Sequence, residues 1–297
     1  MADSAAVAAL YRSTAQASPL HEPAWLRWSL IALAILAMAL LVVLPLAMVI
    51  GAGLAKGAGV WFAALIEPDA IAALKLTLFT AAIVIPLNAV FGVLSAWAVT
   101  RFEFAGKRTL MALIDLPFAV SPVVAGLCLV LLFSPNHGWF AGLLEHFDVK
   151  ILFARPAIVL ATLFITYPFV VRELIPLMQQ QGSDEEIAAR SLGANAWTMF
   201  FRVTLPNIKW GLLYGVLLCG ARAMGEFGAV SVVSGHIRGL TNTLPLHIEI
   251  LYNDFNATAA FAVASLLAGL ALVTLVVKFW LESRHGDALA NAHHRRQ

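Results

Sequence analysis

Long apolar runs alternate with short polar segments along most of the 297-residue chain. A helix needs about 20 apolar residues to cross about 30 Å of hydrocarbon, and four runs of at least 18 residues contain no charged residue. Two further apolar runs are each interrupted by a basic and an acidic residue. The pattern therefore predicts six membrane-spanning helices, over residues 29–50, 76–100, 116–133, 157–178, 210–233 and 257–277.

The first apolar run is too long for the apolar region of a cleaved signal peptide, and more spans follow it. We therefore expect an uncleaved anchor. The first 24 residues are expected to be disordered or loosely bound at the membrane surface. The predicted organisation is a cytoplasmic N-terminal tail, a transmembrane domain with a core at about residues 72–280, and a cytoplasmic C-terminal tail. These parts cover residues 1–28, 29–283 and 284–297.

Lys and Arg residues predict the orientation, because cytoplasmic loops carry an excess of them. With the N-terminus in the cytoplasm, the cytoplasmic segments hold 13 of the 19 Lys and Arg residues, and the outer segments hold 5. Arg222 lies within a span. We therefore expect both termini and the polar segment 179–209 to be cytoplasmic.

The composition is that of a membrane protein. Hydrophobic residues make up 61% of the chain and charged residues 12%, with a mean hydropathy of +0.86, whereas a soluble domain carries about 25% charged residues. The net charge of +2 does not favour a nucleic-acid partner. Cys128 and Cys219 lie in apolar runs and are expected to be inert core thiols. The scattered histidines are not expected to bind a metal.

The segment 179–209 is polar and helix-prone, although it lies between two apolar spans. Ser183 or Asp184 can cap a helix, and the acidic residues that follow suit the positive end of its dipole. Gly193 costs about 1 kcal/mol relative to Ala within a helix, which predicts a turn, a second short helix or the close approach of a partner. Pro206 is expected to turn the chain into the fifth span. The pattern alone leaves contact with a partner and contact with inner-leaflet lipid open.

Arg222 and Glu226 interrupt the fifth span. A charge inside the membrane costs about 2.5–3.5 kcal/mol on insertion scales. The two residues are four apart, so on one helix they share a face and can pair. Two hypotheses remain: a structural ion pair that orients the helix, or a gate or pathway element beside a transported anion.

Glycines and prolines mark places where the spans depart from simple helices. Pro86 in the second span and Pro117 and Pro122 in the third are expected to break or bend helices. Backbone groups freed near Ser121 can face a polar cavity, which makes Ser121 a hypothetical pathway residue. Glycines at three- to five-residue spacing permit close helix contact, and the fifth span carries Gly211, Gly215, Gly220, Gly225 and Gly228.

The polar segment resembles the EAA loop of ABC importer permeases, whose helix docks in a groove of the ATPase. The resemblance rests on Ala188-Ala189, Gly193 and Leu205-Pro206. The family has a glutamate directly before the two alanines, whereas here Ile187 stands there and Glu186 is one residue earlier. The contact of that glutamate with the groove is therefore expected to be shifted or lost. The coupling residues that the resemblance implies are Glu186, Ala188, Ala189, Gly193, Leu205 and Pro206.

Other stretches resemble the W-type permease subunit of sulfate/thiosulfate importers, over nearly the whole chain after about residue 25. GEFGA alone also fits molybdate permeases, whereas the combination of SPVVAG with VSVVSGxIRG indicates sulfate. The matching stretches are DLPFAVSPVVAGL from Asp115, YPFVVREL from Tyr167, TLPNIKWGLLYGV from Thr204, ARAMGEFGAVSVVSG from Ala221 and LPLHIEIL from Leu244.

The resemblance implies an all-α, six-span permease of the bacterial inner membrane with the type I ABC importer fold. A cytoplasmic coupling helix is expected between spans 4 and 5. The implied partners are a T-type permease, two copies of an ATPase, a periplasmic sulfate/thiosulfate-binding protein and membrane lipid. The glycine-rich fifth span is expected to pack against the partner permease. Transport is expected to follow alternating access driven by ATP.

The chain lacks the GxxxxGK[ST] motif that cradles phosphate. ATP hydrolysis, with its Mg²⁺–ATP, is therefore expected in a separate subunit, and no cofactor is expected in this chain. The alternatives are a molybdate or tungstate permease, a polytopic membrane enzyme and a secondary transporter. An enzyme should carry a cluster of His, Asp or Glu at one membrane face. A secondary transporter leaves the polar helix unexplained.

Overall fold

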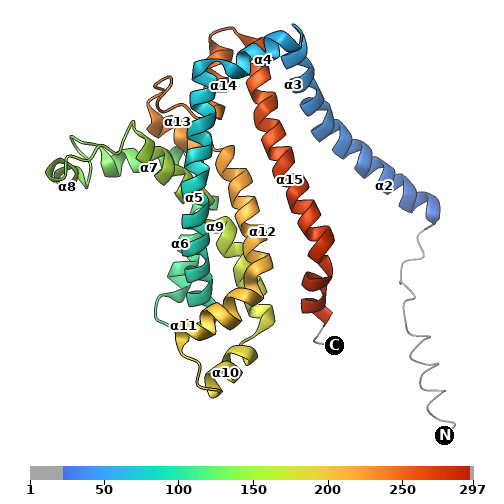
Figure 1. The fold of residues 1–297 in the computed structure, drawn as a ribbon, viewed down its shortest axis with the longest axis vertical. Helices are drawn as coiled ribbons and strands as arrows, with labels where there is room; N and C mark the ends of the chain where they lie inside the picture. Colours follow the sequence, from blue (N-terminus) through green and yellow to red (C-terminus); the bar gives the residue numbers. More distant parts are fainter. Residues whose placement is uncertain (1–22, 295–297) are drawn as a thin grey trace. The chain divides into compact units, whose positions relative to one another are not determined.

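The computed structural model describes residues 23–294, and the side chains of residues 23–280. The expectation for the first 24 residues falls almost entirely outside this range. Every regular element of the described residues is a helix (Figure 1), which confirms the predicted all-α class. The chain divides into two units, residues 1–48 and 49–297.

The first unit carries most of one long apolar helix. Helix α2 (Ala24–Met38), the π-helical turn η1 (Ala39–Val43) and α3 (Leu44–Leu54) form a single candidate span of 31 residues. It begins at Ala24, after Pro23, and so starts five residues before the predicted span. No residue of α2 or η1 is buried. A helix this apolar and this exposed is suited to lipid.

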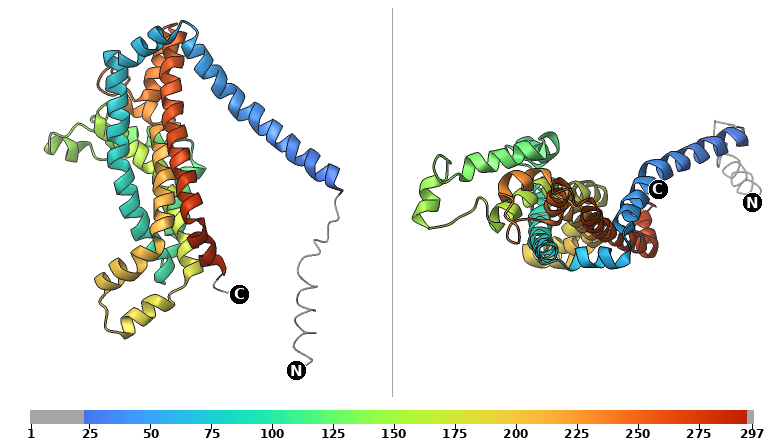
Figure 2. Two further views of the ribbon diagram at one scale, coloured as in Figure 1. Left: turned by 45° about the vertical axis from the view of Figure 1, so that its right-hand side comes forward. Right: turned by 90° about the horizontal axis from the view of Figure 1, so that it is seen from above.

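The second unit contains all the other helices. Helices α5, α9 and α12 pack along one another, and α15 packs against α4, α12 and α14 (Figures 1 and 2). Helices α7 and α8 project from the side of this bundle in each view. The elements are α4 (Ala58–Ile66), α5 (Pro68–Arg101), α6 (Lys107–Ala119), α7 (Pro122–Phe133), α8 (Ala141–His146), α9 (Arg155–Gln181), α10 (Asp184–Ser191), α11 (Ala196–Met199), η2 (Phe200–Thr204), α12 (Leu205–Met224), α13 (Gly228–Ser234), α14 (Leu244–Asn253) and α15 (Ala257–His294).

The six predicted spans correspond to four continuous helices and two bent pairs within the described residues. The third span is not one helix, because α6 and α7 meet at an angle of 113°. The fifth span bends by 52° between α12 and α13. Pro122 occupies the first turn of α7, where a missing backbone N–H costs nothing. In contrast, α5 continues through Pro86, so the break expected there is absent.

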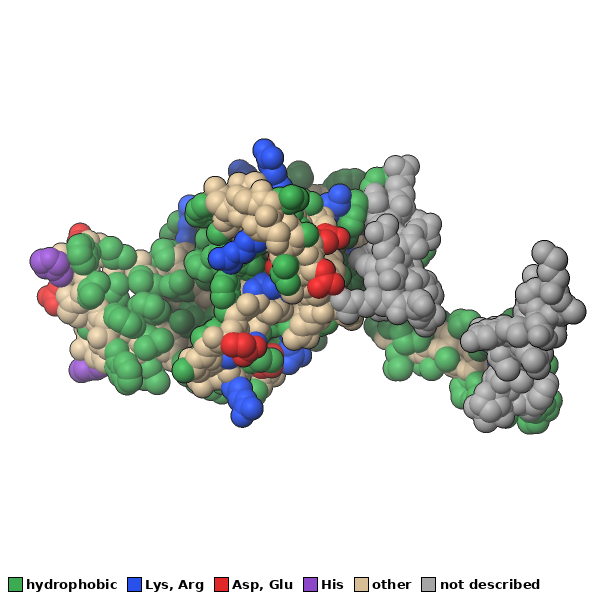
Figure 3. All heavy atoms as spheres, turned by 90° about the horizontal axis from the view of Figure 1, so that it is seen from below, with side chains coloured by type: hydrophobic (Ala, Val, Ile, Leu, Met, Phe, Trp, Pro, Cys, Tyr) green, Lys and Arg blue, Asp and Glu red, His purple; other side chains and the backbone are tan. Residues whose placement is uncertain are grey.

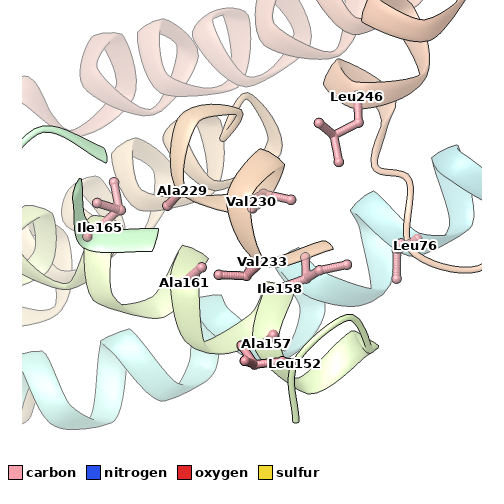
Figure 4. Packing of buried hydrophobic residues seen from close by; sticks show 11 residues of the cluster. Leu76, Leu152, Ala157, Ile158, Ala161, Ile165, Ala229, Val230, Val233 and Leu246 are labelled. Carbon is pink, nitrogen blue, oxygen red and sulfur yellow. The ribbon is translucent and has the colours of Figure 1, made fainter. Parts of the chain in front are cut away.

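The packing between elements is clearest around α13. Val230 and Val233 of α13 lie against Ile158 and Ala161 of α9 in one buried cluster (Figure 4). Leu246 of α14 belongs to the same cluster. Buried aliphatic side chains from α5, α9, α13 and α14 therefore fix the short helix that follows the bend in the fifth span.

Three glycines of the fifth span, Gly211, Gly215 and Gly220, pack against other helices of this chain. A Cβ built on Gly211 would lie 2.3 Å from Leu177 of α9, and one on Gly215 would lie 3.1 Å from the Val170 Cα. Gly220 faces Ile85 of α5 in the same way. These glycines let α12 approach α9 and α5 closely.

A buried polar network joins the same three helices. Asn88 of α5 donates from Nδ2 to Thr166 Oγ1 of α9 at 2.7 Å and to Cys219 Sγ of α12 at 3.3 Å. Cys219 is buried, as predicted, but Cys128 is exposed and is not a core thiol. The sequence alone did not predict a role for Asn88, because its hydrogen-bond partners lie on two other helices.

Candidate functional site

The polar segment after α9 forms two short helices joined by a turn. Helix α10 begins with three acidic residues and ends in a Schellman motif, in which Ala194 N–H donates to Ala189 O and Gly193 N–H donates to Arg190 O. Gly193 has a φ of +87°, which a glycine adopts without strain. The structure therefore confirms one of the alternatives that the sequence left open at Gly193, a turn followed by a second short helix.

The helix caps differ in part from the prediction. Ser183 occupies the cap position of α10, but its side chain makes no capping hydrogen bond. Asn195 caps α11 instead, and its Oδ1 accepts from Thr198 N–H at 2.7 Å. Asparagine just before a helix-forming run is a recognisable capping signal, so the sequence did contain this information.

The chain does not turn at Pro206, which corrects that prediction. A continuous helix runs from Ala196 to Met224 and includes the π-helical turn η2. A π-turn shifts the hydrogen-bond register by one residue, and Pro206 follows directly, in the first turn of α12. The helix therefore passes the proline, and α11 is continuous with α12.

Glu186 points into the protein. Its carboxylate forms an ion pair with Arg101 of α5, with an Oε2–Nε distance of 2.6 Å, and accepts from Thr204 Oγ1 at 2.7 Å. Arg101 also donates to the carbonyl oxygens of Met178 and Gly182. The two side chains are only 13% and 10% exposed. Arg101 therefore joins the start of α10 to the ends of α5 and α9.

The opposite side of the polar segment exposes apolar side chains. Ile187 is 59% exposed, Leu192 89% and Trp197 74%. Trp197 stacks on Phe201, which is also exposed. Lys, Arg, Asp and Glu side chains gather on this end of the second unit (Figure 3). We call Ile187, Leu192, Trp197 and Phe201 the coupling surface. Exposed apolar groups at a charged end are typical of a protein contact.

The other predicted coupling residues lie along the same segment. Ala188 and Gly193 are exposed, as is Pro206, whereas Ala189 and Leu205 are partly buried. Apart from its two chain neighbours, no described residue has an atom within 4 Å of a Cβ built on Gly193. Ala188 and Gly193 are therefore open to a partner rather than packed against this chain.

Arg222 and Glu226 form the predicted ion pair, with an Nη2–Oε2 distance of 2.7 Å. They do not share one helix, which corrects the prediction: α12 ends at Met224, and Glu226 lies in the bend before α13. Glu226 Oε1 also accepts from the Ala229 N–H in the first turn of α13. The Glu226 side chain is 1% exposed and that of Arg222 34%. The pair therefore spans the bend, and its carboxylate is fully enclosed.

Ser121 lies at the 113° bend between α6 and α7 and is exposed. Its carbonyl oxygen accepts from Ala125 N–H, so the start of α7 satisfies it. Gly228 of α13 meets Pro122 of α7, where an added Cβ would lie 2.9 Å from the proline Cβ. The structure thus brings the two bends of the chain, beside Ser121 and Glu226, close together.

His247 of α14 is a buried imidazole that the sequence did not single out. It is 3% exposed, and its Nε2 has no hydrogen-bond partner. Burial lowers the pKa of His247 below its ordinary value, an effect that the carboxylates of Glu67 and Asp69 oppose and Arg238 reinforces. Helix α14 has only 10 residues and is too short to cross a membrane.

Residues 88–286 match the family described as the binding-protein-dependent transport system inner membrane component. The chain belongs to this family, whose members are transport permease components rather than enzymes. Its fold is that of an ABC importer permease. A bacterial alginate ABC transporter, crystallised with an alginate pentasaccharide-bound periplasmic protein, has a TM-score of 0.74 over 88% of this chain and 94% of that chain, at 17% identity.

Two curated relatives are transport permeases of Escherichia coli K12. The sulfate transport system permease protein CysW is 50% identical over 260 residues, which cover 88% of this chain and 89% of CysW. The sulfate transport system permease protein CysT is 40% identical over 220 residues, which cover 74% of this chain and 79% of CysT. The identity is thus higher, and extends further, for the W-type relative.

Proposed function

We propose that this chain is the W-type permease subunit of an ATP-driven importer for sulfate and thiosulfate. The observation that carries the substrate class is the 50% identity to a sulfate permease along most of both chains. The lower identity to CysT favours the W-type role, with a T-type subunit as the second permease. A molybdate or tungstate permease is therefore the less favoured alternative.

The coupling surface supports an attachment point for the ATPase. It is apolar, exposed and located on a segment that Arg101 joins to α5 and α9. Two ATPase copies bind Mg²⁺–ATP and close on one another, and the chain's polar segment follows one of them. Because α11 is continuous with α12, this movement tilts the fifth span and exposes the pathway alternately to each side of the bacterial inner membrane.

The anion is delivered by a periplasmic binding protein that performs the selection. A doubly charged anion needs several hydrogen-bond donors, and the Arg222 guanidinium is the donor that the fifth span offers beside its bend. Glu226 neutralises much of that charge, which suits a passage that binds the anion weakly and releases it. Ser121, close to the same bend, is the second proposed pathway residue.

The test is the initial rate of labelled sulfate uptake in cells that lack a W-type permease but contain the other subunits that belong with this chain. Expression of the chain should restore uptake, and excess molybdate should inhibit it weakly. Cells that also lack the ATPase subunit are the control and should show no uptake. Molybdate uptake without sulfate uptake would contradict the substrate, and uptake without the ATPase would contradict the ATP-driven mechanism.

A further inference from the structure

A cavity of about 480 Å³ opens on the second unit between the first turns of α5, the start of α9 and the loop before α14. Two basic side chains line it, Lys75 and Arg155, and no acidic residue does. Neither cation takes part in an ion pair or hydrogen bond with any described residue. The transport mechanism above makes no use of either group.

The position of the cavity along α5 indicates which layer of the membrane surrounds it. Helix α5 has 34 residues, so it is about 51 Å long at 1.5 Å per residue, compared with about 30 Å for the hydrocarbon core and about 40–45 Å with headgroups. Lys75 lies seven residues after Pro68, about 10 Å from the helix end. Arg155 is the first residue of α9. Both cations therefore lie at the level of the lipid headgroups, on the side away from α10.

The remaining walls of the cavity are apolar. Ile71, Leu76 and Phe79 of α5 form one wall and Leu240 forms another. Phe79 is 45% exposed and Leu240 55% exposed, so these side chains continue from the cavity onto the outer surface. Asp69 Oδ1 lies 3.6 Å from a Cβ built on the wall residue Gly239, but Asp69 itself does not line the cavity.

We propose that Lys75 and Arg155 bind the phosphodiester headgroup of an anionic phospholipid. Two unpaired cations attract an oxyanion, and arginine can hold two of its oxygens at once. A headgroup also carries acyl chains, which the apolar walls at Phe79 and Leu240 accommodate. Free sulfate shares the oxyanion chemistry but makes no use of these walls. The cavity contains none of the residues proposed above for the transport pathway, so the lipid proposal stands whether or not the chain transports sulfate.

The experiment compares lipid binding by the full-length chain, purified in mild detergent with its co-purifying subunits. Native mass spectrometry follows the titration of phosphatidylglycerol and of phosphatidylcholine with the same acyl chains. The double variant Lys75→Gln/Arg155→Gln should bind phosphatidylglycerol about 30-fold more weakly than the wild type, given the attraction of two cations to an anionic lipid. Its binding of phosphatidylcholine should not change.

The matched control is Lys56→Gln/Lys150→Gln, which removes the same charge from exposed lysines that do not line the cavity. It should bind phosphatidylglycerol as the wild type does. The variant Lys75→Arg/Arg155→Lys keeps both charges and should also retain binding. The proposal is overturned if the double glutamine variant binds like the control, or if the charge-conserving variant loses binding to the same extent.

Equilibrium binding of labelled sulfate to the same preparations separates the two oxyanion sources. The glutamine variant should bind sulfate as the wild type does. If it loses sulfate but keeps phosphatidylglycerol, the cavity holds a free oxyanion and the lipid assignment is wrong.

Discussion

Arg101 attaches the polar segment to two of the membrane-spanning helices. Its guanidinium contacts Glu186 and two carbonyl oxygens at the end of α9. Removal of one partner from a buried ion pair leaves the other charge without compensation. The residue is thus a positioning residue, because it fixes α10 to the spans that must move with it.

Arg101→Gln is therefore expected to lower the free energy of unfolding by about 3 kcal/mol and to reduce sulfate uptake more than it reduces ATPase binding. Lys107→Gln is the matched control, since Lys107 also pairs with a glutamate at 2.6 Å, but Glu103 is 89% exposed. An exposed pair contributes about 0–1 kcal/mol. Thermal unfolding, uptake and co-purification of the ATPase check both variants. Equal effects of the two substitutions would contradict the prediction.

His247 predicts a pH dependence of stability. Its pKa is lowered in the folded protein by burial, so the unfolded chain takes up a proton first when the pH falls below the ordinary value of 6.5. The contribution to stability is therefore complete above that pH and decreases below it, until the folded imidazole also becomes protonated.

The expected result is a larger loss of melting temperature between about pH 7.5 and about pH 5.5 for the wild type than for His247→Gln, which has no imidazole to titrate. Thermal unfolding in detergent at the two pH values measures this difference. Identical pH slopes for the two proteins would show that His247 does not titrate differently in the folded and unfolded states.

Some turns and helix bends follow from the local sequence alone, whereas others depend on the helices packed around them. The turn at Gly193 follows from local backbone chemistry, and the sequence offered it as one of its alternatives. The 113° bend at Ser121 follows from Pro122, whereas α5 contains Pro86 and remains continuous. A proline in a helix is tolerated when neighbouring helices support it, and α5 is packed against α9 and α12.

Gly193→Trp is expected to prevent ATPase docking while leaving membrane insertion intact. The space around the glycine is empty within this chain, so the indole would project into the partner's site. Any substitution there also destabilises the turn by about 1–2 kcal/mol, because a residue with a Cβ is strained at a positive φ. Gly193→Ala introduces the same strain without the bulk and is the control. Co-purification with the ATPase measures docking, and a Trp variant that still docks and transports would refute the role of this surface.

At the scale of the molecule, the distribution of Lys and Arg predicts that both termini are cytoplasmic. A fluorescent protein fused after Gln297 should therefore fluoresce, because it folds in the cytoplasm, and alkaline phosphatase fused there should be inactive. Fusions after Gly142, between the third and fourth spans, should show the opposite pattern. The reverse result at both positions would invert the orientation and place the coupling surface on the periplasmic side of the membrane.

The sequence by itself determined the all-α class, the six apolar segments and the place of the polar helix pair. These features depend on hydrophobic runs, capping residues and turns, which are properties of neighbouring residues. Only the tertiary structure decided which way Glu186 faces, which helices receive the glycines of α12, and that the Arg222–Glu226 pair spans a bend. Each of these features depends on residues that are far apart in the chain. The sequence of an apolar span shows that it is apolar, but it does not show which helix packs against it.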